Sequence, residues 1–432
     1  MINVKPTSWS SLPGPENISR TVLPNGIVVL SRSNFASPSV VVQGYLNSGS
    51  LFDPEEKLGL AYFTSQMLMR GTKKKRIQSV FDLLESRGAS LGFSATMHTT
   101  SFGGRSLAED LPTMVRLLAE CIQTPRFPLL QMELLRAQLL TGLSLRAQDT
   151  EEMATITFDE IVFSEHPYRH PEDGFPETVK RIKRPDLMNF HKNAFGPKQM
   201  VVVLVGAVEP QKAVELVTET LGVWQNKNQE EKPSLPKVKP LTKTVRKHVA
   251  IPGKSQTDLI LGTLGPKRSD PEYLAASLGN NVLGQFGMMG RIGDIVREQS
   301  GLAYHASANL NAGIDVGTWE VSAGVNPVNL EKAIDLILKE LKRFISSPVT
   351  KAELQDSKSN YIGRLPLSLE SNAGVAGALL NMERFSLGLD YFQRYASRVN
   401  AVTAEQVLET AQKYLNLDAL AIVSAGTTGE KK

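Results

Sequence analysis

The sequence predicts an α+β protein of two tandem homologous domains, each a mixed, mostly antiparallel sheet packed with helices on one face. Three observations support this class. Apolar residues with helical spacing are interspersed with short β-branched runs, the second half of the chain repeats the order of the first, and a proline-rich stretch separates the halves. With 432 residues, each half is long enough to bury a core of its own.

An internal repeat carries most of this prediction. A helix expected near Glu133 follows a proline-containing break, and the same arrangement recurs near Glu353. An apolar run that ends at Gly206 follows a helix, and its counterpart ends at Gly426. The two members of each pair are 220 residues apart. Two independent pairs at one separation indicate a duplication.

The stretch 226–248 marks the boundary between the copies. It contains Pro233, Pro236 and Pro240 among lysines and has few apolar residues. Proline fixes φ and has no N–H to donate, so we expect an extended, solvated linker here. The domains are therefore predicted at 1–225 and 249–432. A nucleic-acid-binding arm is the alternative interpretation of the lysines.

The individual elements follow from local patterns and from turn residues. Pro24, Asn25 and Gly26 form a turn signal inside the first strand pattern, and Gly88 is placed to end a helix. In chain order we expect strands at 21–32 and 40–46, helices at 58–70 and 77–87, a strand pair at 90–105, a strand at 258–265, a helix at 272–282 and strands at 306–325.

Composition excludes several classes of function. The net charge of +4 comes from 48 basic and 44 acidic residues, which is too weak and too mixed to indicate a nucleic-acid partner. Cys121 is the only cysteine, so no internal disulfide forms, and its apolar helical surroundings predict a buried small side chain. No run approaches the roughly 18 apolar residues of a membrane span, and residues 1–20 have no apolar signal core. We expect a cytoplasmic protein.

The run from Gly59 to Thr72, GLAYFTSQMLMRGT, resembles the zinc helix of the processing-peptidase, pitrilysin and insulinase family. That family usually has GLAHFxEHMxFxGT at this place, which contains the inverted zinc motif H-x-x-E-H. The resemblance covers nearly the whole chain. Its other matching segments are Pro24-Asn25-Gly26, Gly49-Ser50-x-x-Asp53, His166-Pro167-Tyr168 and the run REQSGLAY that ends at Tyr304.

The resemblance also shows what is missing. In the family, two histidines on one helix face and a distal glutamate hold zinc, and the motif glutamate acts as the base. Here Tyr62 and Gln66 stand at the histidine positions and Ser65 at the base position, while 140–144, where the distal glutamate is expected, has no carboxylate. The comparison therefore implies no metal site in this chain.

Other histidines do not replace the lost ligands. His166 and His170 are four residues apart, but Pro167 and Pro171 prevent the helix that would align them. We interpret this segment as a structural turn.

A second family signature is intact. The resemblance implies that Arg297 contacts the backbone of a peptide substrate and that the Tyr304 hydroxyl donates to the developing oxyanion. From the residues alone, Arg297 would equally pair with Glu298 or Asp294 while Tyr304 packs its ring. The glycine-bearing stretch 284–293 fits neither nucleotide-binding pattern, and we expect a hinge before the Arg297 helix.

The resemblance also implies a peptide-binding edge strand at 92–100. In the family a substrate adds to this edge of the sheet, next to the zinc site. The usual Asn-Ala of the family appears here only as Ser94 and Ala95, followed by Thr96.

These features support one leading hypothesis and two rivals. The chain is expected to be the non-catalytic subunit of a heterodimeric zinc metallopeptidase, a peptide hydrolase active only with a homologous partner that holds H-x-x-E-H and the zinc. One alternative is a structural scaffold, as in the core subunits of respiratory complexes, without a role in proteolysis. The other is an autonomous peptidase with an unorthodox site, which stoichiometric zinc in the purified chain would indicate.

Overall fold

The computed structural model describes residues 12–287 and 289–427. They form two compact units, and each unit combines segments that are distant in sequence. Of the described residues, the first unit comprises those up to 143, 171–234 and 366–393, and the second comprises 144–170, those of 235–365 other than 288, and 394–427. The N-terminal segment in which we sought a signal core lies partly outside the described residues.

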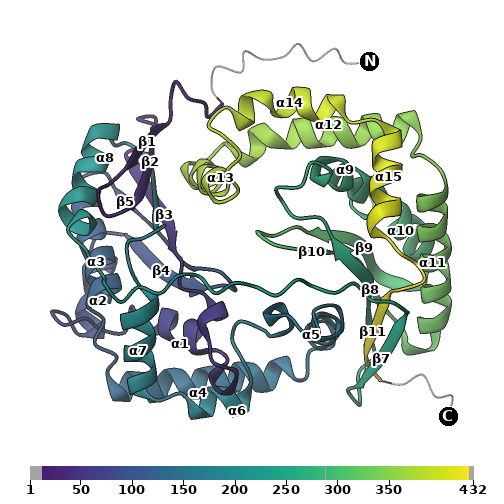
Figure 1. The fold of residues 1–432 in the computed structure, drawn as a ribbon, viewed down its shortest axis with the longest axis horizontal. Helices are drawn as coiled ribbons and strands as arrows, with labels where there is room; N and C mark the ends of the chain where they lie inside the picture. Colours follow the sequence, from purple (N-terminus) through teal and green to yellow (C-terminus); the bar gives the residue numbers. More distant parts are fainter. Residues whose placement is uncertain (1–11, 288, 428–432) are drawn as a thin grey trace. The chain divides into compact units, whose positions relative to one another are not determined.

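The first unit is built on a six-stranded mixed sheet, in the order β1-β2-β6-β3-β5-β4 (Figure 1). The β2–β6 pair is parallel and the other neighbours are antiparallel. The strands are β1 (Ser19–Val22), β2 (Val28–Ser33), β3 (Ser39–Leu46), β4 (Ser90–Ala95), β5 (Thr100–Leu107) and β6 (Val201–Gly206).

Both faces of this sheet are covered, because every residue of β6 is buried. Val202 and Leu204 join the main core with the helices of one face. On the other face, β6 and β3 contact helix α13 (Asn372–Arg384). The remaining helices of the unit include α1 (Leu60–Met67), α2 (Ile77–Glu85), α3 (Leu111–Gln123), α6 (Pro176–Arg181), α7 (Arg184–Ala194) and α8 (Pro210–Val217).

The second unit repeats this design with five strands, in the order β7-β11-β8-β10-β9. The β7–β11 pair is parallel and the others are antiparallel. Trp319 is fully buried in its core, and its indole N–H donates to Asn280 at 3.0 Å. The strands are β7 (Val245–Ala250), β8 (Thr257–Gly265), β9 (Ala303–Asn311), β10 (Gly317–Val325) and β11 (Ala421–Gly426).

The helices of the second unit also cover both faces of its sheet. Leu261 and Ile422 belong to the core under the main helical layer, whereas Ile260 and Val423 pack with α5 (Thr150–Val162) on the opposite face. The other helices are α9 (Tyr273–Gly284), α10 (Gly290–Gly293), α11 (Leu330–Ser346) and α15 (Ala404–Tyr414), with α4 (Leu129–Arg146), α12 (Lys351–Ser368) and α14 (Tyr391–Ala401) spanning unit limits.

The two mixed, mostly antiparallel sheets confirm the predicted class, although helices cover both faces of each sheet where one face was expected, because α13 and α5 pack on the second face. The duplication is visible in the elements. β6 and β11, and likewise α7 and α15, are 220 residues apart, while α4 and α12, and α5 and α13, are 222 apart. The compact units, however, are not contiguous halves of the chain. Helix α5 of the first half packs on the sheet of the second unit, and its counterpart α13 packs on the sheet of the first.

The segment without helix or strand is shorter than the linker expected at 226–248. It has no helix or strand through Thr244, as its prolines require, but β7 begins at Val245. The last proline is Pro240, so the following residues are free to donate backbone hydrogen bonds, and they pair in parallel with β11. Among the residues that the structure describes, no helix combines the length and the apolar character needed to cross a membrane.

Candidate functional site

Helix α1, which carries the degenerate zinc motif, has a specific N-terminal cap. The Asp53 carboxylate accepts hydrogen bonds from the backbone N–H groups of Gly59 and Ala61, at 2.9 and 2.8 Å. Gly59 has φ of +94°, and a Cβ there would lie 2.6 Å from the carbonyl oxygen of Asp173. The Asp53 and Gly59 positions of the motif therefore define where the helix starts.

Two of the side chains at the positions of the zinc motif form hydrogen bonds within the chain. Gln66 donates from Nε2 to the carbonyl of Phe93 on β4 at 3.2 Å, and the buried Ser65 hydroxyl donates to the Tyr62 carbonyl at 2.7 Å. Burial and the nearby Asp173 carboxylate raise the pKa of Tyr62 above its usual value. A neutral phenol and an amide in these places do not fit zinc, and Ser65 is no base for a bound water.

Helix α4 supplies no third ligand. Leu140 packs against the core, while Thr141, Gly142 and Ser144 are exposed. Within residues 12–287 and 289–427, no group of three His, Cys, Asp or Glu side chains could hold a metal ion. The donor set does not fit the zinc ion that the family resemblance implies at this helix.

The expected peptide-binding strand is shorter than the sequence indicated. β4 is the edge strand of the first sheet and ends at Ala95, and a turn follows in which the Thr96 N–H donates to the Thr99 carbonyl. Ser94 is exposed and Ala95 is buried. The carbonyl of Thr96 accepts the N–H of Ser50, so the backbone of Thr96 is already paired. The expected continuous strand over 92–100 is interrupted at this turn.

Arg297 and Tyr304 lie on the second unit, on adjoining elements. Arg297 is in the π-helical turn η6 (Asp294–Gln299), which packs against β9, and Tyr304 is the second residue of β9, the edge strand of its sheet. The Tyr304 side chain is 68% exposed. Arg297 contacts Glu298 at 3.5 Å, and its side chain is 35% exposed.

The glycine-bearing stretch before Arg297 is anchored, which sequence reasoning missed. Arg291 forms two 2.7 Å hydrogen bonds with the Glu353 carboxylate and lies 3.5 Å from Glu340. Met289 and Gly290 have positive φ, at 76° and 64°, and Met288 is outside the described residues. No local pattern in the sequence joins Arg291 to a glutamate 62 residues away.

His166 belongs to a turn, as its flanking prolines indicated. Its Nδ1 accepts the backbone N–H of Tyr168 at 3.2 Å, and the ring is almost fully buried. Burial lowers the pKa of His166 and raises that of Tyr168. Cys121 is completely buried, and burial raises the pKa of its thiol to about 12, in agreement with an inert packing role.

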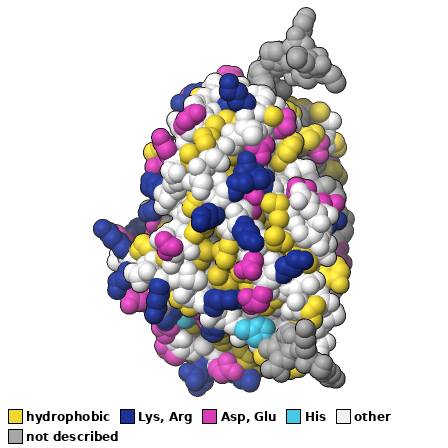
Figure 2. Space-filling view, turned by 90° about the vertical axis from the view of Figure 1, so that its right-hand side faces the viewer, with side chains coloured by type: hydrophobic (Ala, Val, Ile, Leu, Met, Phe, Trp, Pro, Cys, Tyr) yellow, Lys and Arg dark blue, Asp and Glu magenta, His cyan; other side chains and the backbone are white. Residues whose placement is uncertain are grey.

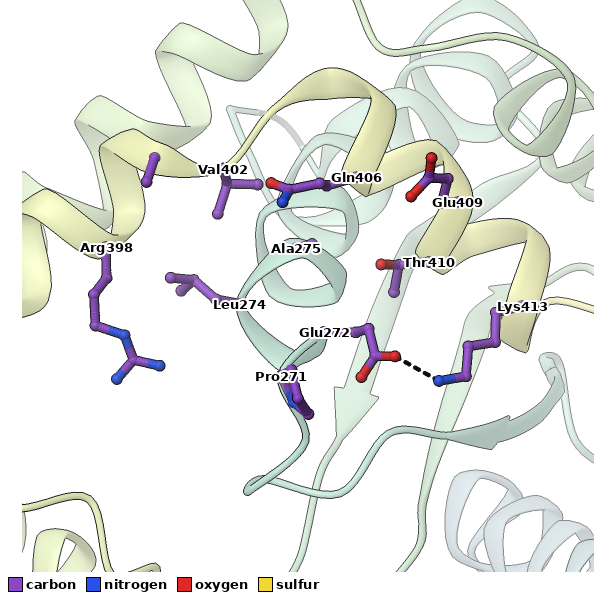
Figure 3. A pocket seen from close by; sticks show the side chains of 11 residues that line it. Pro271, Glu272, Leu274, Ala275, Arg398, Val402, Gln406, Glu409, Thr410 and Lys413 are labelled. Carbon is purple, nitrogen blue, oxygen red and sulfur yellow. Dashed lines mark hydrogen bonds and ion pairs between the residues drawn. The ribbon is translucent and has the colours of Figure 1, made fainter.

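A groove of about 590 Å³ lies on the second unit, and none of the predicted site residues lines it. Leu274, Ala275 and Val402 provide its apolar part (Figure 3). At one end Glu272 and Lys413 form an ion pair at 2.6 Å. On the face of the molecule drawn in Figure 2, described Lys and Arg side chains lie among acidic and apolar ones without forming one basic field.

The fold, the capped α1 and the retained Arg297 and Tyr304 define a class, the insulinase-type two-domain proteins. The model described as insulinase (peptidase family M16) matches residues 28–164, and the model described as peptidase M16 inactive domain matches residues 181–361. The chain belongs to the insulinase family, and with Tyr62, Ser65 and Gln66 in its motif it is a non-catalytic member.

Particular relatives are consistent with this assignment. An uncharacterized zinc protease of Mycobacterium leprae is 26% identical over 92% of this chain and 89% of its own length. A non-peptidase homologue of Helicobacter pylori is 23% identical over 92% of both chains. Subunit 1 of the mitochondrial cytochrome b-c1 complex of Rattus norvegicus is 26% identical over 62% of this chain and 55% of its own.

A solved structure extends the comparison over the whole fold. The crystal structure of a peptidase M16 inactive domain from Pseudomonas fluorescens has a TM-score of 0.89 and 27% identity, covering 96% of this chain and 100% of that one.

Proposed function

We propose that this chain is the non-catalytic subunit of a two-chain zinc peptidase. Arg297 and Tyr304 contact the peptide, while a homologous partner with an intact H-x-x-E-H motif holds the zinc and activates the water. No zinc belongs to this chain. As a separate contact, we propose that the β4 edge of the first unit, at Ser94 and Ala95 with Thr96 in the turn that follows, accepts an extended peptide segment.

The exposure of Tyr304 is the observation that carries this proposal. A tyrosine kept for packing would bury its ring, but Tyr304 is 68% exposed at an edge strand whose neighbours Ala306 and Ala308 are buried. Its hydroxyl is therefore available to a group outside this unit. An O–H aimed at a tetrahedral intermediate stabilises the negative charge that develops there.

Arg297 is also available to a ligand. Its contact with Glu298 is long, at 3.5 Å, and involves a neighbouring, partly exposed carboxylate. Such an ion pair contributes little, so a peptide carbonyl or carboxylate can replace it at small cost. The packing of η6 against β9 keeps Arg297 and Tyr304 on adjoining elements, so both can act on the same bound peptide.

The test is a reconstitution of activity from two purified chains. Mixed with the H-x-x-E-H homologue encoded by the same organism, the wild-type chain should produce cleavage of a fluorogenic peptide that neither chain performs alone. Tyr304→Phe should lower kcat by about 100- to 1000-fold, as loss of an oxyanion donor does. Tyr273→Phe, in the same unit but stacked on Arg268, is the matched control and should retain activity. Full activity of Tyr304→Phe would refute the assignment.

A structural role in a larger complex is the second candidate, and the similarity to a cytochrome b-c1 subunit supports it. In that case Arg297 and Tyr304 contact another subunit and no peptide is cut. Purification from the source organism separates the two: a complex that lacks any H-x-x-E-H chain, together with no activity on mixing, would favour the scaffold.

A further inference from the structure

Arg384, the last residue of α13, has a guanidinium group that is not paired with any carboxylate of the described residues. Its Nε is buried and has no hydrogen-bond partner among them. Its Nη2 donates to the Thr99 hydroxyl over a long 3.4 Å, and the group lies over the Tyr45 ring, 4.6 Å from the centroid. The adjacent Glu383 is already engaged, because both of its oxygens accept from Arg20. The first unit thus contains a half-buried cation without an anion.

The state of this arginine indicates what it would bind. Burying an unpaired charge costs free energy, which a bound anion would offset. Burial lowers the pKa of Arg384, and the neighbouring Tyr45 phenol counteracts this only in part. A guanidinium presents its N–H donors in a planar fork that matches the two oxygens of a carboxylate. Contact with the ring already restricts this fork, so less conformational entropy is lost when a ligand binds.

The sheet face beside this guanidinium is open. Helix α13 packs on β3 (Figure 1), and the strands beyond it, β5 and β4, carry small residues on the same face. Tyr45 pairs with Ser101, which pairs with Ser94, and paired residues point to one face. Gly103 and Gly92 form the next row. A Cβ on Gly92 would have no atom within 4 Å, and one on Gly103 would first meet a side-chain atom at 4.0 Å. We call Gly92, Ser94, Ser101 and Gly103 the open face.

The charges on these strands favour an anionic ligand. β3, β4 and β5 contain no aspartate or glutamate, and their one charged residue is the exposed Arg105. Arg105 is two residues from Gly103 along β5, so it points to the same face. The open face therefore has Arg384 beyond one end and Arg105 at the other. An extended chain that carries a negative charge is complementary to this arrangement.

We propose that the open face binds an extended peptide segment and that Arg384 binds a carboxylate of this peptide, either its terminal carboxyl group or an acidic side chain. Nε and Nη2 then donate to the two oxygens, which gives the buried Nε an acceptor and replaces the long contact with Thr99. Glycine in a strand allows another backbone to approach closely, as Gly92 and Gly103 do here. The inference rests on the peptide contact proposed for the β4 edge and names the chemistry that this contact selects.

The Nε–Hε NMR signal of Arg384 in the ¹⁵N-labelled full chain tests the carboxylate site. Sodium acetate, exchanged for sodium chloride at constant ionic strength, should shift this signal in a saturable way. Arg384→Gln identifies the signal by removing it. Arg70→Gln is the matched control, because the Arg70 guanidinium donates to Gln131 and Gln138 and lies on α1-side residues of the same unit, and it should leave the response unchanged. A signal that does not respond to acetate would overturn the proposal.

Three acetylated peptides test the peptide contact and the source of the carboxylate. Trialanine with a free carboxyl group, trialanine amide and Ala-Glu-Ala amide carry a terminal carboxylate, none and a side-chain carboxylate. At least one of the two carboxylate peptides should bind at least about 10-fold more tightly than trialanine amide, and the tighter one identifies the source. In Arg384→Gln all three should bind equally weakly. Equal affinities in the wild type would overturn the role of Arg384.

Gly103→Val separates the open face from the arginine. Valine suits a strand but fills the space above Gly103, so peptide binding should weaken at least about 10-fold while the response to acetate is kept. Undiminished peptide binding would overturn the assignment of the open face. All of these measurements use this chain alone, so their failure is distinguishable from a failure of the reconstituted peptidase, which depends on Tyr304.

Discussion

Replacing Arg291 with methionine should destabilise the second unit by about 3 kcal/mol, because it leaves two carboxylates without their shared cation. The Arg291 side chain is 11% exposed, and its guanidinium also lies over the Phe344 ring, at 5.8 Å. Glu340 is 2% exposed and would keep only Arg343, whose side chain is 59% exposed. Glu353 is 31% exposed, so water can reach it.

The magnitude follows from this difference in burial. Removing one member of a buried ion pair typically costs about 3–5 kcal/mol, and the hydration still open to Glu353 places the loss at the lower end. Glu353 also accepts hydrogen bonds from the N–H and hydroxyl of Thr350, at 2.8 Å each, so it keeps its place at the start of α12 in the variant. The loss therefore reports on the ion pair and not on a broken helix cap.

Arg291 also sets the pH dependence of this contribution. Its hydrogen bonds hold the pKa of Glu353 at about 2, below the usual value. A carboxyl group with a depressed pKa stabilises the fold fully above its unfolded value near 4.5, and the contribution disappears as the pH falls towards 2. The difference between wild type and Arg291→Met should shrink over the same interval.

Urea unfolding followed by Trp319 fluorescence, in a Trp9→Phe/Trp224→Phe background, isolates the second unit. Arg246→Met is the matched control, because its ion pair with Glu331 is on the surface and should cost less than about 1 kcal/mol. An Arg291→Met variant within 1 kcal/mol of the wild type would show that the cluster does not anchor the segment before Arg297.

Two further predictions concern the first unit. Asp53→Ala should lower the free energy of unfolding by about 1–2 kcal/mol, because the N–H groups of Gly59 and Ala61 at the start of α1 lose their acceptor. Hydrogen exchange of the α1 amides should become faster relative to that of the α3 amides. Unchanged exchange would contradict the cap. Burial lowers the pKa of His191. As the pH falls, this histidine is therefore protonated in the unfolded chain before it is protonated in the folded chain. The free energy of unfolding should be largest above about pH 6.5 and decline below it. The urea midpoint followed by Trp224 should fall between pH 7.5 and 5.5, and less so in His191→Gln; equal slopes for the two proteins would exclude His191 as the cause.

Most elements of the fold were predictable because their signals are local. The turn at Pro24 to Gly26 lies between β1 and β2 as its residues require, and Gly88 takes a positive φ of 58° just after α2. β7 was missed because its sequence, VRKHVA, is mostly exposed and has polar residues at its centre, and its pairing with β11 defines it as a strand. Local composition carries no information about such a partner.

The candidate site was likewise predictable only where its signals are local. Spacing alone places Tyr62 and Gln66 on one face of α1, but the hydrogen bond from Gln66 to the carbonyl of Phe93 depends on how β4 packs. The anchoring of Arg291 by Glu353 likewise joins elements whose distance in the chain hides the contact. Helix α5 has an apolar face made by Ala154, Phe158 and Val162, yet nothing in that pattern says which of the two sheets it covers.

The exchange of α5 and α13 has a consequence for how the chain is made. Asn34 hydrogen-bonds to Asn372 at 2.8 Å, a contact that spans 338 residues. During synthesis the first sheet emerges early, but one of its faces stays uncovered until α13 has left the ribosome. In the second unit the order is reversed, because helix α5 is synthesised long before the strands on which it packs. Neither unit can be completed from its own half of the chain, so both must finish folding late and together, and slow, non-local folding is the expected result.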